Sequence, residues 1–124
     1  MIDFKNGNYV KLKKVSNDSV GKNLYSLLLD DEQIISTYKA MRDYVVFTNK
    51  RFISVNVQGV TGKKQDYTSM PYKKISVFSI ETSGAFDLDS ELELYFSGVG
   101  KVKFEFSGAS DIVTIGKIIS SYVL

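Results

Sequence analysis

The sequence contains no cysteine and no histidine, and these two absences exclude much of the chemistry that proteins perform. Without cysteine the chain forms no disulfide and has no thiolate nucleophile or thiolate metal ligand. Without histidine it lacks the commonest general base and the commonest metal ligand. The Ser, Lys and carboxylate residues show no organisation typical of a catalytic triad. We therefore expect a protein that is not an enzyme and that uses no cofactor or metal.

Long apolar runs and a strong excess of one charge are also missing. The longest apolar runs, such as residues 27 to 29 and 118 to 119, are far shorter than the roughly 18 residues of a membrane span. A balance of 16 basic against 14 acidic residues gives a net charge of +2, too small to predict binding to nucleic acid or anionic lipid. Residues 1 to 8 lack the apolar core of a secretory signal, so we expect a cytoplasmic location.

What is present fits one compact domain. The chain has 124 residues, of which 44% are hydrophobic and 24% are charged, a balance typical of globular proteins. Its only proline is Pro71, and no repeat, low-complexity segment or Pro-rich linker divides it. We expect an N-terminal arm with a short amphipathic helix over residues 1 to 30, followed by a β-rich domain over residues 31 to 124.

β-branched and aromatic residues dominate the chain after this arm, in short runs separated by turn signals. The pattern predicts seven strands, near residues 33 to 41, 44 to 49, 51 to 57, 64 to 70, 75 to 82, 90 to 96 and 101 to 106. In the last two strands apolar and charged residues alternate, so each should have one exposed face and one core face. This alternation permits Glu93 to lie opposite Lys103 across the final hairpin. Residues 9 to 15 form a short strand or an extended arm.

Two helices are expected at the ends of this β region. Asn17 or Asp18 can cap the first, which ends near Leu29. Its apolar face consists of Val20, Leu24, Leu27 and Leu28. The second covers residues 110 to 123, with Ser110 as N-cap. Its apolar face consists of Ile112, Ile115, Ile119 and Tyr122. This terminal helix can cover the open end that curled, packed sheets leave.

Several short motifs occur in a characteristic order along the middle of the chain. They are Arg42-Asp43, the turn from Phe47 to Arg51, the Gln58-Gly59 and Thr61 to Lys64 turn, Pro71-Tyr72, and the stretch from Glu81-Thr82 to Asp87-Leu88-Asp89. In this order they resemble the bacterial pleckstrin-homology-like (PH-like) family, whose pattern has an aspartate where this sequence has Asn56. With the flanking strands and helix, the resemblance spans most of the chain.

The resemblance implies a mainly β, PH-like fold, in which a seven-stranded antiparallel β-roll of two packed sheets is capped by a C-terminal helix. It also implies a tendency to form homo-oligomeric rings, without an agreed activity or ligand. We interpret the chain as a non-catalytic binding or assembly module that associates with itself, and possibly with another protein. The candidate interface or ligand surface consists of Arg42, Asp43, Gln58, Lys63, Lys64 and Asp66. Arg42 and Asp43 form either a turn pair or a buried ion pair.

Exposed strand edges are the expected means of self-association, because an unprotected edge pairs with another chain. The strand over residues 44 to 49 has no charge, and that over 51 to 57 has its only charge at Arg51. Protection of these strands by charge is therefore sparse.

The loop around Lys63 and Lys64 allows an alternative function. A phosphate-binding P-loop is excluded, because two residues rather than four separate Gly59 from Gly62. We read this segment as a hairpin turn whose glycines adopt positive φ. The alternative is a peripheral membrane adaptor that binds phosphate headgroups through a cluster of basic side chains, namely Lys50, Arg51, Lys63 and Lys64. Asp43 and Asp66 would dilute this cluster, so we rank the adaptor second.

Two further patterns have structural interpretations. Asp87, Asp89, Glu91 and Glu93 share one parity, but a calcium-binding EF-hand loop would need Gly at Leu92 and Glu at Gly98. We interpret them as an acidic strand face. The phenylalanines could stack nucleic-acid bases, but most lie in apolar strand contexts, so we assign them to the core. They are Phe47, Phe52, Phe78, Phe96, Phe104 and Phe106.

Overall fold

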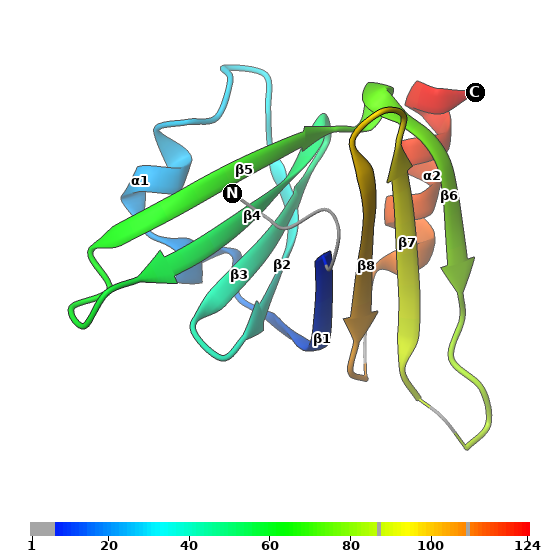
Figure 1. The fold of residues 1–124 in the computed structure, drawn as a ribbon, viewed down its shortest axis with the longest axis horizontal. Coiled ribbons are helices and arrows are strands. Elements are labelled where there is room, and N and C mark those ends of the chain that lie inside the picture. The colour runs from blue at the N-terminus through cyan, green and yellow to red at the C-terminus, as the bar shows by residue number, and fades with distance from the viewer. Residues whose placement is uncertain (1–6, 87, 109) are drawn as a thin grey trace.

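The computed structural model describes residues 7 to 86, 88 to 108 and 110 to 124 of the chain. Eight strands form one strongly curled sheet, and a C-terminal helix packs against part of it (Figure 1). In chain order the elements are β1 (Gly7–Val15), η1 (Asn17–Val20), α1 (Lys22–Tyr25), β2 (Ile34–Ala40), β3 (Asp43–Thr48), β4 (Arg51–Gln58), β5 (Lys64–Pro71), η2 (Tyr72–Lys74), β6 (Ile75–Glu81), β7 (Ser90–Phe96), β8 (Gly100–Phe106) and α2 (Ile112–Val123).

Strand β1 joins the two halves of the sheet, whose order is β5-β4-β3-β2-β1-β8-β7-β6. It pairs antiparallel with β2, placing Lys13 opposite Lys39, and parallel with β8, placing Tyr9 opposite Phe104. The register shifts between Tyr9 and Leu12, and Lys11 has a φ of 56° in this irregular stretch. Such a bulge bends a strand, which lets one strand serve two differently oriented partners.

The mainly β fold with a C-terminal helix is confirmed, and the seven predicted strands appear as β2 to β8. The strand count differs by one, because residues 7 to 15 form a strand in the middle of the sheet. The two expected sheets are therefore the halves of one continuous sheet. Over residues 11 to 15 Leu12 is the one fully buried side chain, so this part of β1 has little of the apolar alternation that marks a strand.

The main core lies inside the curled sheet and is rich in aromatic rings, as the sequence predicted. The rings of Phe52 and Phe104 meet edge to face at 5.1 Å, and those of Tyr38 and Phe106 at 4.6 Å. Phe47, Phe96 and Phe106 are also buried, and Phe78 packs at the margin of this core. The phenylalanines fill the barrel, so their role as core residues is confirmed.

A second, smaller core covers the opposite face of β3 and β4. Alternate residues of these strands, such as Val46 and Ile53, pack against Val20 and Leu24 of the N-terminal segment. Their neighbours Val45 and Phe52 point into the main core. Both strands are thus buried on both faces, which explains why charge occurs only at their first residues, Asp43 and Arg51. They are interior strands, so the prediction that they are exposed edges is wrong; the edges are β5 and β6.

The N-terminal helix is shorter than predicted. It divides into η1 and α1 at Gly21, whose φ of 78° is incompatible with a continuing helix. Val20 and Leu24 are buried as expected, but Leu27 lies beyond the helix and is exposed. Leu28 also packs against the second core, so of the predicted apolar face only Leu27 does not contribute.

Helix α2 closes one end of the curled sheet. Ile112, Ile115 and Ile119 are buried, whereas Tyr122 is partly exposed. The N-cap is Asp111 instead of the predicted Ser110. Its backbone N–H donates to the Tyr38 hydroxyl at 2.8 Å, and its carboxylate pairs with Lys14 at 2.8 Å. Contacts from β1 and β2 thus fix where the helix begins. No helix in the described part of the chain has the length and apolarity to cross a membrane.

The packing of α2 gives a direct test of the fold. Ile119→Asp should lower the free energy of unfolding by more than about 4 kcal/mol, because it buries a carboxylate without a partner. Val113→Asp, on the same helix but with a side chain 62% exposed, should change it by less than about 0.5 kcal/mol. Urea unfolding followed by circular dichroism measures both, and equal effects would contradict the packing described.

Candidate functional site

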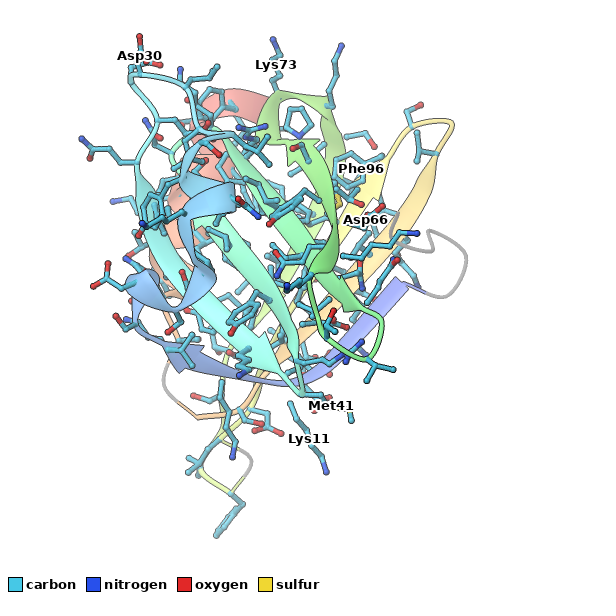
Figure 2. The ribbon with its side chains drawn as sticks, turned by 90° about the vertical axis from the view of Figure 1, so that its left-hand side faces the viewer. Lys11, Asp30, Met41, Asp66, Lys73 and Phe96 are labelled. Atoms are coloured by element: carbon cyan, nitrogen blue, oxygen red, sulfur yellow. The ribbon has the colours of Figure 1, made fainter. Side chains whose placement is uncertain are left out.

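Two ends of the curled sheet carry the candidate residues. Figure 2 shows Met41 and Lys11 at one end and Lys73 and Asp30 at the other. The Met41 end comprises two segments, the turn between β2 and β3 and the loop between β4 and β5. The Lys73 end comprises residues 27 to 32, the turn between β3 and β4, η2 and the last turn of α2.

Arg42 and Asp43, at the Met41 end, both bind the backbone of Val57. The Val57 N–H donates to Asp43 Oδ1 at 2.9 Å, and Arg42 Nε donates to the Val57 carbonyl at 3.1 Å. These bonds attach the turn between β2 and β3 to the end of β4. Arg42 is exposed, so of the two alternatives the turn pair is confirmed and the buried ion pair is wrong.

Gln58, Lys63, Lys64 and Asp66 belong to the neighbouring hairpin. Gln58 lies opposite Lys64, and Asp66 lies opposite Asn56, across β4 and β5. The Asn56 amide nitrogen lies 3.5 Å from Asp43 Oδ2, where an aspartate would repel that carboxylate. All six predicted residues therefore lie in or beside the Met41 end, and Asp43 connects the two turns.

The loop between β4 and β5 is the predicted hairpin turn. Gly59 and Gly62 have φ values of 76° and 69°, in the left-handed region that favours glycine. Lys63 and Lys64 are exposed there. The four-residue basic cluster of the membrane alternative does not form, because Lys50 and Arg51 lie at the opposite end of β4, about 20 Å of extended chain away.

The acidic face is confirmed on β7. Glu93 lies opposite Lys103, as predicted, and ion pairs run diagonally from Glu91 to Lys103 at 3.3 Å and from Glu93 to Lys101 at 3.7 Å. Two of the four acidic residues are thus neutralised by the adjacent strand. Asp87 lies outside the described residues.

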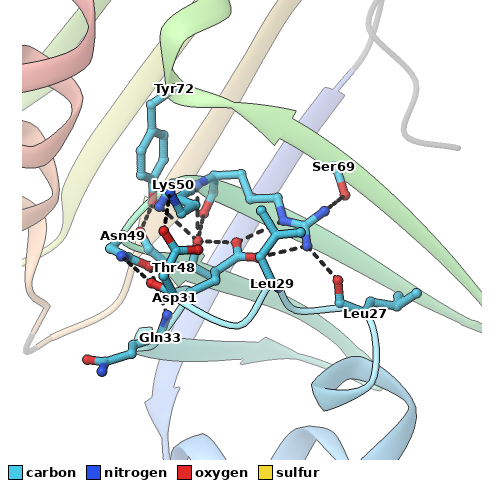
Figure 3. Close-up of polar contacts among 11 residues, drawn as sticks. Leu27, Leu29, Asp31, Gln33, Thr48, Asn49, Lys50, Ser69 and Tyr72 are labelled. Atoms are coloured by element: carbon cyan, nitrogen blue, oxygen red, sulfur yellow. Dashed lines mark hydrogen bonds and ion pairs between the residues drawn. The ribbon is translucent and has the colours of Figure 1, made fainter.

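A network that the sequence did not reveal occupies the Lys73 end (Figure 3). The side chain of Glu32 is fully buried and forms two bonds with Arg51, one to Nε and one to Nη2, each of 2.9 Å. Thr48 donates its hydroxyl to Glu32 at 2.7 Å, and the Leu29 N–H donates at 3.1 Å. The carboxylate is therefore bonded through both oxygens, as a buried charge requires.

Further bonds extend this network to neighbouring elements. Arg51 donates to Ser69 of β5 and to the carbonyl of Leu27, each at 2.9 Å. The buried Tyr72 hydroxyl donates to the Thr48 carbonyl at 2.7 Å, which ties η2 to β3. The Phe47 to Arg51 motif thus has a structural explanation, because Thr48 and Arg51 hold a buried carboxylate.

The environment of Glu32 determines its ionisation. Burial alone would raise its pKa, but the hydrogen bonds from Arg51, Thr48 and the Leu29 N–H outweigh burial and hold the pKa below its usual value. Burial also raises the pKa of the Tyr72 phenol, so this hydroxyl stays protonated as a donor. The network therefore contains a fixed negative charge matched by Arg51.

A half-open pocket of about 380 Å³ lies beside this network. Leu27 and Leu29 form one wall, Lys50 and Arg51 another, and Pro71, Lys73 and Tyr122 complete it. Four segments that are distant in sequence meet here, and the buried ion pair lies at its base. The pocket has the size and mixed apolar and polar lining of a small-molecule site.

Comparison with known proteins identifies the family. The sequence profile described as Bacterial PH domain matches residues 3–123. The chain belongs to the bacterial PH domain family. It is 43% identical over 109 residues to the uncharacterized protein YjqA of Bacillus subtilis (strain 168), in a match covering 86% of this chain and 87% of that protein.

Solved structures agree with this assignment and with the PH-like fold. A DUF1696 family protein with a pleckstrin-homology domain from Shewanella loihica PV-4 is 41% identical, with a TM-score of 0.73 and coverage of 93% of this chain and 99% of that one. A pleckstrin homology domain from Shewanella amazonensis SB2B is 44% identical, with a TM-score of 0.59 and coverage of 89% and 92%. The resemblance noted in the sequence is confirmed.

The buried ion pair of this bacterial PH domain predicts a stability effect. Arg51→Met leaves the Glu32 carboxylate buried without its partner and should cost about 3 to 5 kcal/mol of unfolding free energy at pH 7. Urea denaturation measures this loss, and a cost below about 1 kcal/mol would show that the pair is dispensable.

The pH dependence of the same pair forms a separate test. Because the folded-state pKa of Glu32 is lowered, its contribution is complete above the unfolded-state value of about 4.3 and is lost as pH falls through the folded-state pKa. The difference in stability between the native protein and Glu32→Gln should therefore shrink below about pH 4. Glu81→Gln, at an exposed glutamate, is the control and should show little effect at any pH. A constant difference would contradict the lowered pKa.

Proposed function

We propose that this bacterial PH domain is a non-catalytic assembly module whose copies join through the edges of the sheet. The observation that carries this proposal is that β5 and β6 each pair with one strand only within the described chain. The outer N–H and C=O groups of an edge strand can pair with another chain. Association of β5 with β6 of the next copy would satisfy both edges.

The two edges differ in how well they are protected. Strand β5 begins at the exposed Lys64 and ends at Pro71, features that discourage pairing. Strand β6 has its only charge at Glu81, and its outward side chains include Ser79 and the exposed Val77. We therefore assign β6 as the more receptive edge. Because β5 and β6 are different surfaces, their contact is head-to-tail, and closing such contacts gives a ring.

The polar residues of the Met41 end would complete this interface. Gln58, Lys64 and Asp66 lie on the hairpin that contains β5, and Arg42 is attached to β4 beside it. Charged groups at the rim of an interface set its register and orientation more than its affinity. A non-catalytic role accords with the structural use of Arg42 and Asp43, which hold turns together. A cytoplasmic location is part of this proposal.

Self-association should respond to changes at the edge and at the rim. Light scattering at several concentrations should give a fixed multiple of the 13.9 kDa chain mass. Arg42→Glu should reduce this mass because it reverses the charge at the rim. Ser79→Lys should do the same by placing a charge on the β6 edge.

Two matched variants control this measurement. Lys13→Glu carries the same charge reversal as Arg42→Glu, but on the interior strand β1. Ser97→Lys matches Ser79→Lys, but in the exposed turn between β7 and β8. Both controls should keep the native mass. A monomer at every concentration refutes the proposal, as does a multimer that neither edge nor rim variant alters.

A membrane adaptor is the second candidate function, and one observation favours it. Met41 and Val60 are almost fully exposed at the tips of the two loops of the Met41 end. Lys63 and Lys64 are exposed in the same loop as Val60. Apolar tips flanked by lysines can insert into a membrane surface while the ammonium groups bind anionic lipid.

Vesicle sedimentation separates this candidate from the assembly module. The vesicles contain equal amounts of phosphatidylcholine and phosphatidylglycerol. An adaptor should bind them, and salt should weaken this binding. The double variant Lys63→Glu with Lys64→Glu should no longer bind. The control, Lys22→Glu with Lys117→Glu, has the same charge change at exposed sites elsewhere and should still bind. We expect that the native protein does not sediment with the vesicles. If it does sediment, and only the Lys63 and Lys64 variant loses this binding, the adaptor function is established instead.

A further inference from the structure

The pocket at the Lys73 end combines a cationic side with an apolar side. Lys50, Arg51 and Lys73 contribute three positive charges, against the single buried carboxylate of Glu32. Leu27, Leu29 and Tyr122 are 47%, 58% and 41% exposed and line the same pocket, so their apolar surfaces are grouped. A site of this composition is complementary to a molecule with an anionic head and an apolar body.

The charges of this pocket are not all used within the protein. The nitrogens of Arg51 bind Glu32, Ser69 and the Leu27 carbonyl, so this residue forms a fixed part of the base. Lys50 pairs with Asp31 at 3.1 Å, but the Asp31 side chain is 76% exposed, and a ligand anion can compete for such a surface pair. Among the described residues, no carboxylate lies within ion-pair distance of Lys73. Lys73 is therefore the ammonium group best able to bind a ligand.

The apolar wall is held in place by the ion pair beneath it. The Leu27 carbonyl accepts from Arg51 at 2.9 Å, and the Leu29 N–H donates to Glu32 at 3.1 Å (Figure 3). The backbone of this loop is therefore fixed while both leucine side chains remain exposed. Pre-organisation of this kind lowers the entropic cost of binding. Tyr122, also in the lining, packs against Tyr72 with ring centroids 5.9 Å apart, which holds its ring in place.

We propose that this pocket binds an amphipathic anion, a single alkyl chain bearing a carboxylate or a phosphate. The head lies between Lys50 and Lys73, and the chain lies along Leu27, Leu29 and the Tyr122 ring. The volume of about 380 Å³ suits a medium-length chain and lies within the range of small-ligand sites. The pocket is at the opposite end of the sheet from the polar rim of the Met41 end, but Pro71 of the β5 edge belongs to its lining.

Calorimetric titration of the full chain tests the proposal with four probes. Decanoate and octyl phosphate, each below its micelle concentration, should bind at one saturable site per chain, and whichever binds more tightly identifies the head group. Decanol, which lacks the charge, and inorganic phosphate, which lacks the chain, should each bind at least about tenfold more weakly. Equal binding of decanol and decanoate, or no saturation with either anion, would overturn the proposal.

Variants locate the site. Lys73→Gln should weaken binding of the anions about tenfold, while Lys74→Gln, at the adjacent exposed lysine outside the pocket, should leave it unchanged. Leu27→Ser with Leu29→Ser should weaken binding similarly, and Val99→Ser with Val113→Ser is the matched control at exposed apolar positions elsewhere. Thermal unfolding confirms that each variant is folded. Equal effects of the Lys73 and Lys74 changes would refute the site.

Light scattering on the leucine variant excludes another explanation for the apolar wall. If Leu27→Ser with Leu29→Ser lowers the native mass and leaves binding of the anions intact, the wall is a contact between copies and the ligand proposal is wrong. An unchanged mass with weakened binding supports the pocket.

Discussion

The buried carboxylate of Glu32 is the constraint on which the Lys73 end depends. A charge removed from water must be bonded on all sides, and here the partners are Leu29 of the same loop and Thr48 and Arg51 of the turn between β3 and β4. Satisfying it brings the loop after α1, the turn between β3 and β4, and β5 to fixed positions. Arg51 is placed so that it can also bind Ser69 and the Leu27 carbonyl. The geometry of the pocket is therefore a consequence of compensating one negative charge.

Burial of β3 and β4 on both faces has a comparable effect on the rest of the sheet. The inner face belongs to the aromatic core, and the outer face is covered by Val20 and Leu24. Because these strands are covered on both faces, they form the rigid centre of one half of the sheet. The exposed edges fall instead on β5 and β6, at the two ends of the strand order. The outer backbone groups of β5 and β6 are therefore the ones left without a neighbouring strand among the described residues.

The parts of the fold that could be predicted from the sequence are those where local pattern and burial agree. The alternation in β7 and β8, and the spacing of Ile112, Ile115 and Ile119, translated directly into buried faces. Apolar runs without alternation were ambiguous, because an unprotected edge strand and a strand buried on both faces have similar sequences. Glu32 could not be found, since an acidic residue in an Asp-Asp-Glu run normally indicates solvent exposure. Its partner Arg51 is 19 positions away, and no local pattern connects the two.

The positions of the two candidate sites follow from the direction of β4. This strand begins at Arg51 in the ion pair and ends at Gln58 beside the polar rim, so it reaches both ends of the curled sheet. Basic residues that are near in sequence are therefore separated in space: Lys50 and Arg51 face the pocket, while Lys63 and Lys64 lie on the hairpin beyond Gln58. A single site for a lipid headgroup therefore cannot use all four basic side chains. The strand between them is buried on both faces and separates the two ends by about 20 Å of extended chain. Strand β5 has a similar course, since it ends at Pro71 in the pocket lining, so the proposed ligand and a copy paired with β5 would meet at this residue.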